Sequence, residues 1–309
     1  MTQILVSGLI NIETTLRVEE FPVTYAPVRY PFWGVRSTAS GVGYNLAKAL
    51  TTLGDKVRFL SLVGTDMWGS MVQRILAEAN IPRVDVLPQL RETAQSVIIY
   101  NDEGKRMIHV DLKDIQEQAY PADRFNAALS RCELAILCNV NWNRPFLAHA
   151  AQAGKPIATD VHTISSLDDP YNGDFMAAAT ILFMSDEQLP CAPEEWARRV
   201  QNRYGTPIIV IGLGRAGALL AVKADNFRER IAAVQTRPVV NTIGAGDALF
   251  SAFNHIYAQT ADPYQAIQHA VVFASYKIGT TGAAEGFLTA PELLELARPF
   301  LNRPTTNRP

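Results

Sequence analysis

The sequence predicts an α/β fold with a doubly wound, mainly parallel sheet and a small β appendage that forms a lid. Short apolar runs alternate with longer helical patterns along most of the chain. Residues 134–137 and 208–211 are continuously apolar, as parallel strands covered on both faces should be. Two stretches, 12–36 and 92–113, break this alternation and are assigned to the lid.

The expected elements follow from apolar periodicity and from glycine or proline at their ends. In residues 41–53, Leu46, Leu50 and Leu53 recur at helical spacing, and Gly54 ends the helix. The strands are expected at residues 4–6, 57–63, 134–138, 156–160, 180–184 and 207–212. The helices are expected at residues 41–53, 69–79, 145–153 and 193–203 and from residue 248 onward.

The lid is predicted from two irregular stretches. Residues 12–36 contain three prolines among aromatic residues, so they cannot form one helix. Residues 92–113 contain two apolar runs on either side of a turn at residues 101–104, which indicates a β-hairpin. We expect one domain over residues 1–309, with these stretches as its lid and a disordered tail at residues 302–309.

Composition excludes several classes of protein. The 309 residues are 48% hydrophobic and 19% charged, with a net charge of −2, so a large core is expected and attraction to nucleic acid is not. The N-terminus lacks a signal peptide, and no apolar run is long enough to cross a membrane. The three cysteines form no CxxC pair. We therefore expect a soluble cytoplasmic protein without a membrane partner.

The strongest motif is NTIGAGD at residues 241–247, followed by a helical pattern. Gly244, Ala245 and Gly246 lie just before a helix N-terminus, where unpaired N–H groups and about half a positive elementary charge favour an anion. Asp247 in the first turn could then take a proton from a hydroxyl beside a phosphate. From the residues alone, a glycine turn capped by Asp247 explains the motif equally well.

A second motif, ASGVGYN at residues 39–45, precedes another helix. Gly41 and Gly43 permit a tight turn with Asn45 near the helix start, which is a sufficient structural explanation. Further along, Gly64, Asp66 and Gly69 form a GxDxxG pattern.

Together the two motifs resemble the N- and C-terminal signatures of the ribokinase-like (PfkB) family, and the resemblance covers nearly the whole chain. It implies an ATP-dependent kinase that phosphorylates a hydroxyl of a sugar or nucleoside, with Mg-ATP as donor. Asp247 would be the catalytic base and the 244–246 amides would hold the developing charge. The implied acceptor residues are Asn11, Glu13, Gly41, Gly43 and Asn45, with Ile98 and Tyr100 from the lid. His109 could also face the acceptor, but its place in an alternating strand favours a structural role. The implied nucleotide residues are Gly212, Gly214, Gly217, Thr242, Gly279 and Gly282.

The chain departs from the family pattern at four places. Ser40 replaces the first glycine of GGxxxN, and Val42 replaces the lysine of ribokinases, which argues against ribose as the acceptor. Asn241 replaces an aspartate that the family links with a monovalent-cation site, so activation by potassium is not expected. The NxxE element that organises magnesium is Ser-Asp-Glu-Gln at residues 185–188, which leaves Glu187 as the candidate metal ligand.

Two rival functions remain open at this point. Residues 212–217 spell GxGxxG after an apolar strand, which is the pattern of a NAD-dependent oxidoreductase. The short run at residues 218–222 fits the second strand of a hairpin better than a crossover helix. A relative that binds a sugar or nucleoside without turnover is the second rival. Exposed lid edges also make a homodimer through the lid an expectation.

Overall fold

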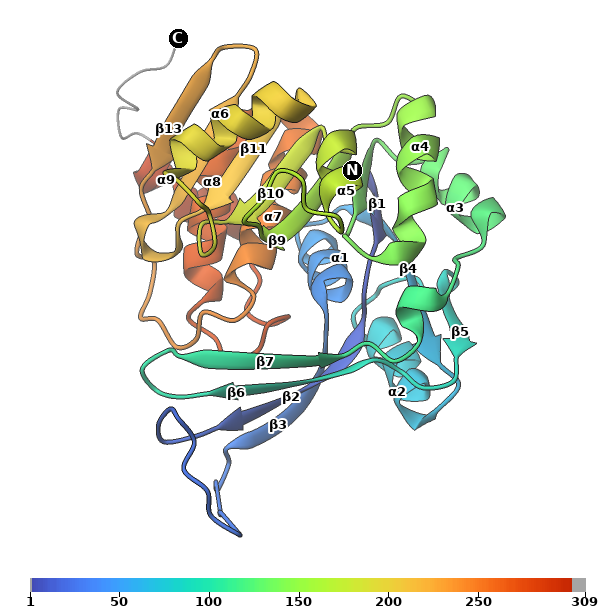
Figure 1. The fold of residues 1–309 in the computed structure, drawn as a ribbon, viewed down its shortest axis with the longest axis vertical. Helices are drawn as coiled ribbons and strands as arrows, with labels where there is room; N and C mark the ends of the chain where they lie inside the picture. The colour runs from blue at the N-terminus through green and yellow to red at the C-terminus, as the bar shows by residue number, and fades with distance from the viewer. Residues whose placement is uncertain (1, 302–309) are drawn as a thin grey trace.

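The computed structural model describes residues 2–301, so the tail predicted to be disordered lies outside the described residues. Within that range, nine strands form one sheet in the order β13-β12-β11-β10-β9-β8-β1-β4-β5 (Figure 1). The pairs from β5 to β11 are parallel, whereas β12 is antiparallel to both of its neighbours. The predicted doubly wound, mainly parallel sheet is confirmed. The strands are β1 (Gln3–Ser7), β4 (Lys56–Gly64), β5 (Val86–Leu90), β8 (Leu134–Leu137), β9 (Ile157–Thr163), β10 (Ile181–Ser185), β11 (Ile208–Gly212), β12 (Ala218–Val222) and β13 (Phe227–Ile231).

Helices cover both faces of this sheet because successive strand residues point to opposite sides. Ile4 and Val6 of β1 belong to one apolar cluster, and Leu5 belongs to the other. The first cluster includes residues of α1 (Val42–Thr52), α2 (Met67–Glu78), α7 (Ala245–Thr260), α8 (Pro263–Lys277) and α9 (Ala290–Leu301). The second includes residues of α3 (Ala122–Leu129), α4 (Arg144–Gln152), α5 (Gly173–Ala178) and α6 (Pro193–Tyr204).

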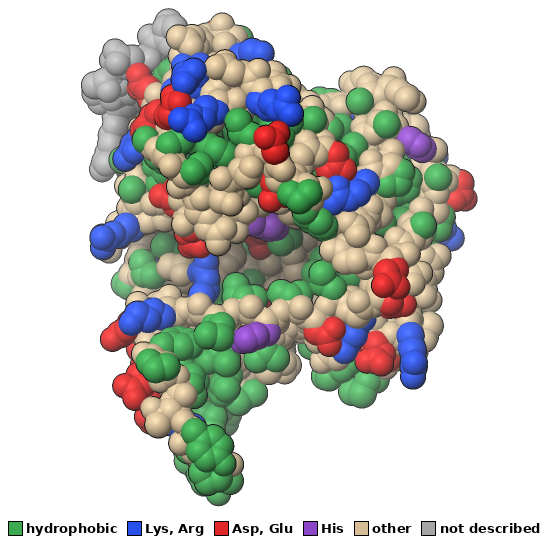
Figure 2. Space-filling model, in the orientation of Figure 1, with side chains coloured by type: hydrophobic (Ala, Val, Ile, Leu, Met, Phe, Trp, Pro, Cys, Tyr) green, Lys and Arg blue, Asp and Glu red, His purple; other side chains and the backbone are tan. Residues whose placement is uncertain are grey.

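A second, four-stranded sheet has the order β3-β2-β6-β7 and lies apart from the main layers (Figure 1). Its strands are β2 (Asn11–Arg17), β3 (Val35–Ser40), β6 (Gln95–Tyr100) and β7 (Arg106–Asp111). These strands come from the two stretches that the sequence excluded from the main sheet. β6 and β7 form the predicted hairpin, and β2 pairs in parallel with β6. Figure 2 shows a deep hollow between this small sheet and the large body.

The remaining sequence predictions of elements agree with the structure to within a few residues. The expected strands at 57–63 and 180–184 are β4 and β10, and the expected helices at 41–53 and 193–203 are α1 and α6. The sequence analysis left β5, β13 and the helices α3, α5, α8 and α9 unassigned. Along residues 2–301, no helix is long and apolar enough to cross a membrane.

Candidate functional site

The candidate site lies where the main sheet, two helix N-termini and the small sheet meet. In parallel α/β sheets, ligands bind beyond the carboxyl ends of the strands. The chain runs from the end of β1 through residues 8–10 into β2, so the two sheets are joined at this edge. α1 begins there after Gly41, and α7 begins there after Gly244.

Gly43 shows why this edge is so tightly built. A Cβ atom at Gly43 would lie 2.5 Å from the carbonyl carbon of Gly8, so the first turn of α1 packs directly on the backbone that follows β1. The structure therefore supports the packing explanation of this glycine. The substrate role of Gly41 and Gly43 stays a prediction.

The N-terminus of α7 offers unpaired amides. Gly244 is its N-cap residue, with φ of 77°. The N–H of Ala245 donates to the carbonyl of Thr242 at 3.2 Å, so this amide is already used within the protein. Across residues 2–301, the N–H groups of Gly246 and Asp247 have no acceptor. Two free amides at the start of a 16-residue helix are a suitable cradle for a phosphate.

Asp247 connects the two sequence motifs. The amide Nδ2 of Asn45 in α1 donates to Oδ2 of Asp247 at 2.7 Å, across 202 residues of sequence. Asn45 is 3% exposed, so its side chain is fixed by the core around it. The hydrogen bond holds the carboxylate beside the free amides of its own helix turn.

The electrostatics of this carboxylate suit a base. Burial raises the pKa of Asp247 above its ordinary value, while the hydrogen bond from Asn45 lowers it. His162 and Asp160 at the end of β9 act on it in opposite directions, since His162 lowers the pKa of Asp247 and Asp160 raises it. The sequence analysis missed these two β9 residues, although their place at the carboxyl end of an expected strand was a usable signal.

Two buried polar residues of β2 face the same region. Oε2 of Glu13 accepts a hydrogen bond from the hydroxyl of Ser40 at 2.9 Å. Burial raises the pKa of Glu13, and the nearby Asp247 charge adds to this rise, whereas the Ser40 hydrogen bond opposes it. Nδ2 of Asn11 donates to Ser96 at 2.9 Å. Its Oδ1 is buried and has no hydrogen-bond partner within residues 2–301, so it can accept a hydroxyl from a ligand.

The small sheet also presents its inner face to the loops before α7 and after α8. Ile98 of β6 is 2% exposed and packs with Ile243 and Ala283 beside the glycine turn. Tyr100 is two residues further along the same strand and therefore lies on the same face. His109 pairs with Val97, on the opposite face from Ile98, so the structure does not bring this histidine to the site.

Two arginines of the small sheet were missed by the sequence analysis. Arg106 of β7 donates to the hydroxyl of Thr242 at 3.1 Å. Arg36 of β3 donates to Thr281 at 2.8 Å and forms an ion pair with Glu285. These contacts join the two outer strands of the small sheet to the loops on both sides of α7 and α8. The sequence could have indicated Arg36, because the side chains of a strand alternate between its faces and Arg36 therefore lies on the same face of β3 as Ser40.

Residues 212–217 do not form a dinucleotide fingerprint. They connect β11 to its antiparallel neighbour β12, as the sequence analysis expected of a hairpin. A fingerprint would open a crossover helix, so the oxidoreductase alternative is wrong. A Cβ atom at Gly214 would meet no atom within 4 Å, whereas Gly217 packs against the carbonyl of Ile231.

The other predicted nucleotide residues lie near the glycine turn. Thr242 precedes it and is exposed. The space beside Gly279 is taken by Arg237, and the space beside Gly282 is taken by Glu285. The structure thus places both glycines against side chains of the protein itself, and their nucleotide role stays a prediction.

Glu187 is exposed in the turn after β10. Its N–H donates to the hydroxyl of Ser185 at 3.3 Å, and the neighbouring Asp186 N–H donates to the carbonyl of Gly212. Among residues 2–301, no group of three or more His, Cys, Asp or Glu side chains could hold a metal ion. A magnesium ion here would take most of its ligands from phosphates and water, which is its usual mode in kinases.

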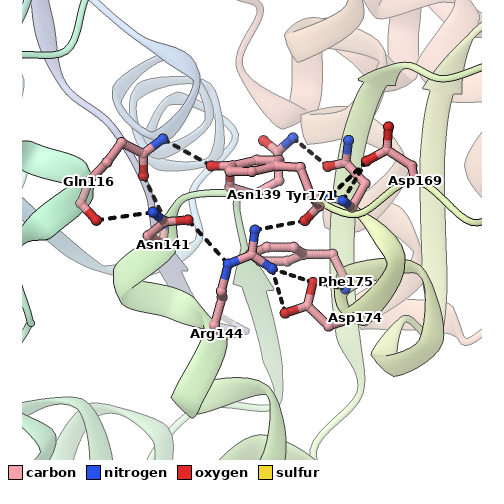
Figure 3. Close-up of polar contacts among 9 residues, drawn as sticks. Gln116, Asn139, Asn141, Arg144, Asp169, Tyr171, Asp174 and Phe175 are labelled. Atoms are coloured by element: carbon pink, nitrogen blue, oxygen red, sulfur yellow. Dashed lines mark hydrogen bonds and ion pairs between the residues drawn. The ribbon is translucent and has the colours of Figure 1, made fainter.

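A polar network fixes the loops beyond β8 and β9 (Figure 3). The Arg144 guanidinium lies near the faces of the Tyr171 and Phe175 rings, donates to the carbonyl of Tyr171 and pairs with both oxygens of Asp174 at 2.5 Å (Figure 3). The Tyr171 hydroxyl bridges Gln116 and the carbonyl of Asn139. This network connects the segment after β7 to two loops at the carboxyl edge of the main sheet.

These features define an α/β protein in which two free helix amides and a partly buried carboxylate share one helix N-terminus beside a second sheet. Residues 1–290 match the pfkB family of carbohydrate kinases. The chain belongs to this family and is a phosphotransferase with an alcohol acceptor.

Individual relatives agree with this assignment. Acarbose 7(IV)-phosphotransferase of Actinoplanes sp. is 27% identical over 256 residues, covering 82% of this chain and 84% of that protein. ATP-dependent ribose-1-phosphate kinase of Halopiger xanaduensis is 24% identical over 291 residues, covering 92% of this chain and 94% of that protein. Among solved structures, a microbiome-derived acarbose kinase has a TM-score of 0.87 at 24% identity over 96% of this chain and 99% of its own. Arabidopsis thaliana ribokinase, complexed with ribose and ATP, has a TM-score of 0.81 at 17% identity over 96% of this chain and 98% of its own.

Proposed function

We propose that this kinase transfers the γ-phosphoryl group of Mg-ATP to a primary hydroxyl of a sugar or nucleoside, with Asp247 as the general base. The observation that carries the proposal is the hydrogen bond from Asn45 to Asp247, which sets the carboxylate beside the free amides of Gly246 and Asp247. Asp247 takes the proton of the attacking hydroxyl as the oxygen–phosphorus bond forms and the bond to ADP breaks. Loss of such a base costs about 10²–10⁴-fold in rate.

The developing negative charge on the phosphoryl group is held at the N-terminus of α7. The amides of Gly244, Gly246 and Asp247 fit this role better than the amide of Ala245, which donates to Thr242. The carboxylate and the amides act together because phosphoryl transfer depends mostly on positioning and electrostatics.

The acceptor lies between the main body and the small sheet, which serves as the lid. Asn11 Oδ1 accepts one acceptor hydroxyl, and Glu13 and Asn45 bind others. Gly41 and Gly43 shape the floor, and Ile98 and Tyr100 cover the acceptor from the lid. Relatives named for acarbose, ribose-1-phosphate and deoxyribose give the first compounds to test as acceptors.

The nucleotide lies on the other side of Asp247, along the loop before α7, the turn at residues 212–217 and residues 279–282. Arg237 and Glu285 move to admit it if the adenine takes the space beside Gly279 and Gly282. Magnesium, when bound, neutralises charge on the phosphates, and Glu187 is the candidate protein ligand. The three free cysteines and the use of ATP fit a reducing cytoplasm.

A homodimer through the lid is the proposed assembly. The loop between β2 and β3 exposes large aromatic side chains, with Tyr25 89%, Phe32 80% and Trp33 103% exposed. Such a surface on an isolated subunit favours association.

The test is ADP release with Mg-ATP across acarbose, ribose-1-phosphate, pentoses, hexoses and nucleosides, for the wild type and Asp247→Asn. Acceptor-dependent ADP release that is lost in Asp247→Asn supports the proposal, because asparagine keeps the shape of the side chain and removes the base. A folded wild type that binds ATP and every acceptor without turnover would instead support the binding-only alternative. Equal rates in the wild type and in Asp247→Asn would refute the role of Asp247.

A further inference from the structure

A lysine with no surface exposure lies directly behind the glycine turn. Lys277 in the last turn of α8 is 0% exposed, and its Nζ donates to the carbonyl oxygen of Ile243. Ile243 immediately precedes Gly244, the N-cap residue of α7. A fully buried ammonium is costly, so its retention at this position needs a reason.

The Lys277 charge is not neutralised by a direct ion pair. Among residues 2–301, no carboxylate lies within 4.0 Å of its Nζ. The charged groups that act on it from further away are Asp247, Glu285 and Glu13, which favour the ammonium, and Arg237, which disfavours it. Burial outweighs them and lowers the pKa of Lys277 to about 8, so the ammonium form still predominates at neutral pH. The site therefore contains a positive charge that the substrates do not supply.

The peptide unit between Ile243 and Gly244 connects the Lys277 ammonium to the site by polarisation. In a planar trans peptide, the carbonyl oxygen and the amide hydrogen point in opposite directions. A cation held on the carbonyl of Ile243 therefore turns the N–H of Gly244 to the other side of the peptide plane and polarises it. The Ile243 side chain packs against Ile98 and Ala283.

We propose that Lys277 is a positioning residue whose ammonium serves as a built-in monovalent cation for the anion-binding turn, so that the kinase needs no free potassium or ammonium ion. Lys277 is not placed in contact with substrate, because its Nζ is held on the carbonyl oxygen of Ile243, which points away from the N–H of Gly244. It acts through the Ile243–Gly244 peptide and through its charge. The proposal rests on the phosphoryl transfer proposed above.

The test compares Lys277→Ala with the wild type in buffers of choline chloride, potassium chloride or ammonium chloride at equal ionic strength. In choline, Lys277→Ala should lose about 10²–10³-fold in kcat, as for loss of an oxyanion-hole donor. Potassium or ammonium ions should restore much of this loss, because a small cation can enter the space left by the side chain. The wild type should have the same kcat in all three salts. The KM for the acceptor should change little.

Lys155→Ala is the matched control. Nζ of Lys155 also donates to a backbone carbonyl, that of Cys132 at 2.6 Å, but it precedes β9 at the amino edge of the sheet, away from the site. Its loss should leave kcat unchanged in every salt. A Lys155→Ala variant that loses kcat and regains it with potassium would show that cation rescue is not specific to the turn.

Three results would overturn the proposal. They are a wild type that potassium activates, a Lys277→Ala variant with wild-type kcat in choline, and a folded inactive variant that no cation restores. If Lys277→Ala does not fold, Lys277→Met keeps the side-chain volume without the charge, and the salt independence of the wild type remains decisive. A wild type that releases no ADP refutes the proposed function instead. The cation effect is then measured on the affinity for ATP by calorimetry.

Discussion

Gly244 and Gly246 should respond in opposite ways to alanine. Gly244 has φ of 77°, and a Cβ atom there would lie 2.6 Å from the carbonyl oxygen of Ala283. A Cβ atom at Gly246 would meet no atom within 4 Å. The first glycine is therefore required by the fold, and the second is not. If Gly246 is needed at all, the need comes from a ligand.

The expected changes in stability follow from these contacts. A non-glycine residue in the left-handed region costs about 1–2 kcal/mol, and overpacking against backbone costs about 1–3 kcal/mol. Gly244→Ala should thus lower the free energy of unfolding by about 2–5 kcal/mol, which corresponds to a Tm lower by about 4–10 °C. Gly246→Ala should raise the free energy of unfolding by about 0.4–1 kcal/mol, because alanine restricts the unfolded chain.

The effect of Gly246→Ala on activity should be opposite to its effect on stability. The added methyl group of Gly246→Ala occupies the open space beside two free amides, so kcat/KM for ATP should fall by about 10²-fold, as for a small misplacement of reacting groups. Thermal unfolding and ADP release are measured on the same preparations. A Gly246→Ala enzyme that is more stable and fully active would refute the assignment of this space to the transferred phosphoryl group.

Three further predictions concern the base, the loop network and the assembly. Asn45→Ala removes a hydrogen bond that lowers the pKa of Asp247, so this pKa should rise. The acidic limb of the kcat–pH profile should then move to higher pH. An unchanged acidic limb would contradict the assignment of Asp247 as the base. Arg144→Met removes the contacts to Asp174 and should lower the free energy of unfolding in urea by about 1–3 kcal/mol, with kcat nearly unchanged. Trp33→Ser should shift the protein from dimer to monomer in sedimentation without lowering Tm; an unchanged mass would exclude the loop as the interface.

The sequence was sufficient for most strands of the main sheet because their signals are local, although the edge strands β5 and β13 were missed. Continuous apolar runs predicted β8 and β11, and helical spacing after Asp247 predicted α7. The hairpin of β6 and β7 was predicted from one turn. The parallel pairing of β2 with β6 was not predicted, since it joins segments that no local signal relates. Long-range pairing depends on the packing of the whole molecule.

The residues of the candidate site also divide into those related by a local sequence motif and those brought together only by the fold. The glycines and Asp247 belong to one short motif, so their proximity follows from the sequence. The contact of Asp247 with Asn45 joins residues 202 positions apart and was not predicted, because the sequence analysis assigned the two residues separate roles. Lys277 could not be selected at all, because a lysine in the last turn of a helix is ordinarily explained by the helix dipole.

The small sheet also places polar residues close to Asn45 and Asp247. Glu13 on β2 accepts a hydrogen bond from Ser40 on β3, and Ser40 lies 3.5 Å from Oδ1 of Asn45, whose Nδ2 binds Asp247. Burial is the largest cause of the raised pKa of both Glu13 and Asp247. The single hydroxyl hydrogen of Ser40 is donated to Glu13, so the 3.5 Å approach to Asn45 is a close polar contact and not a second hydrogen bond. Displacement of the small sheet would admit water to Glu13 and remove this contact. Because burial is the largest cause of the raised pKa of Asp247, we expect this pKa to fall, and Asp247 to be a weaker base in the proposed reaction, when displacement of the small sheet admits water to it.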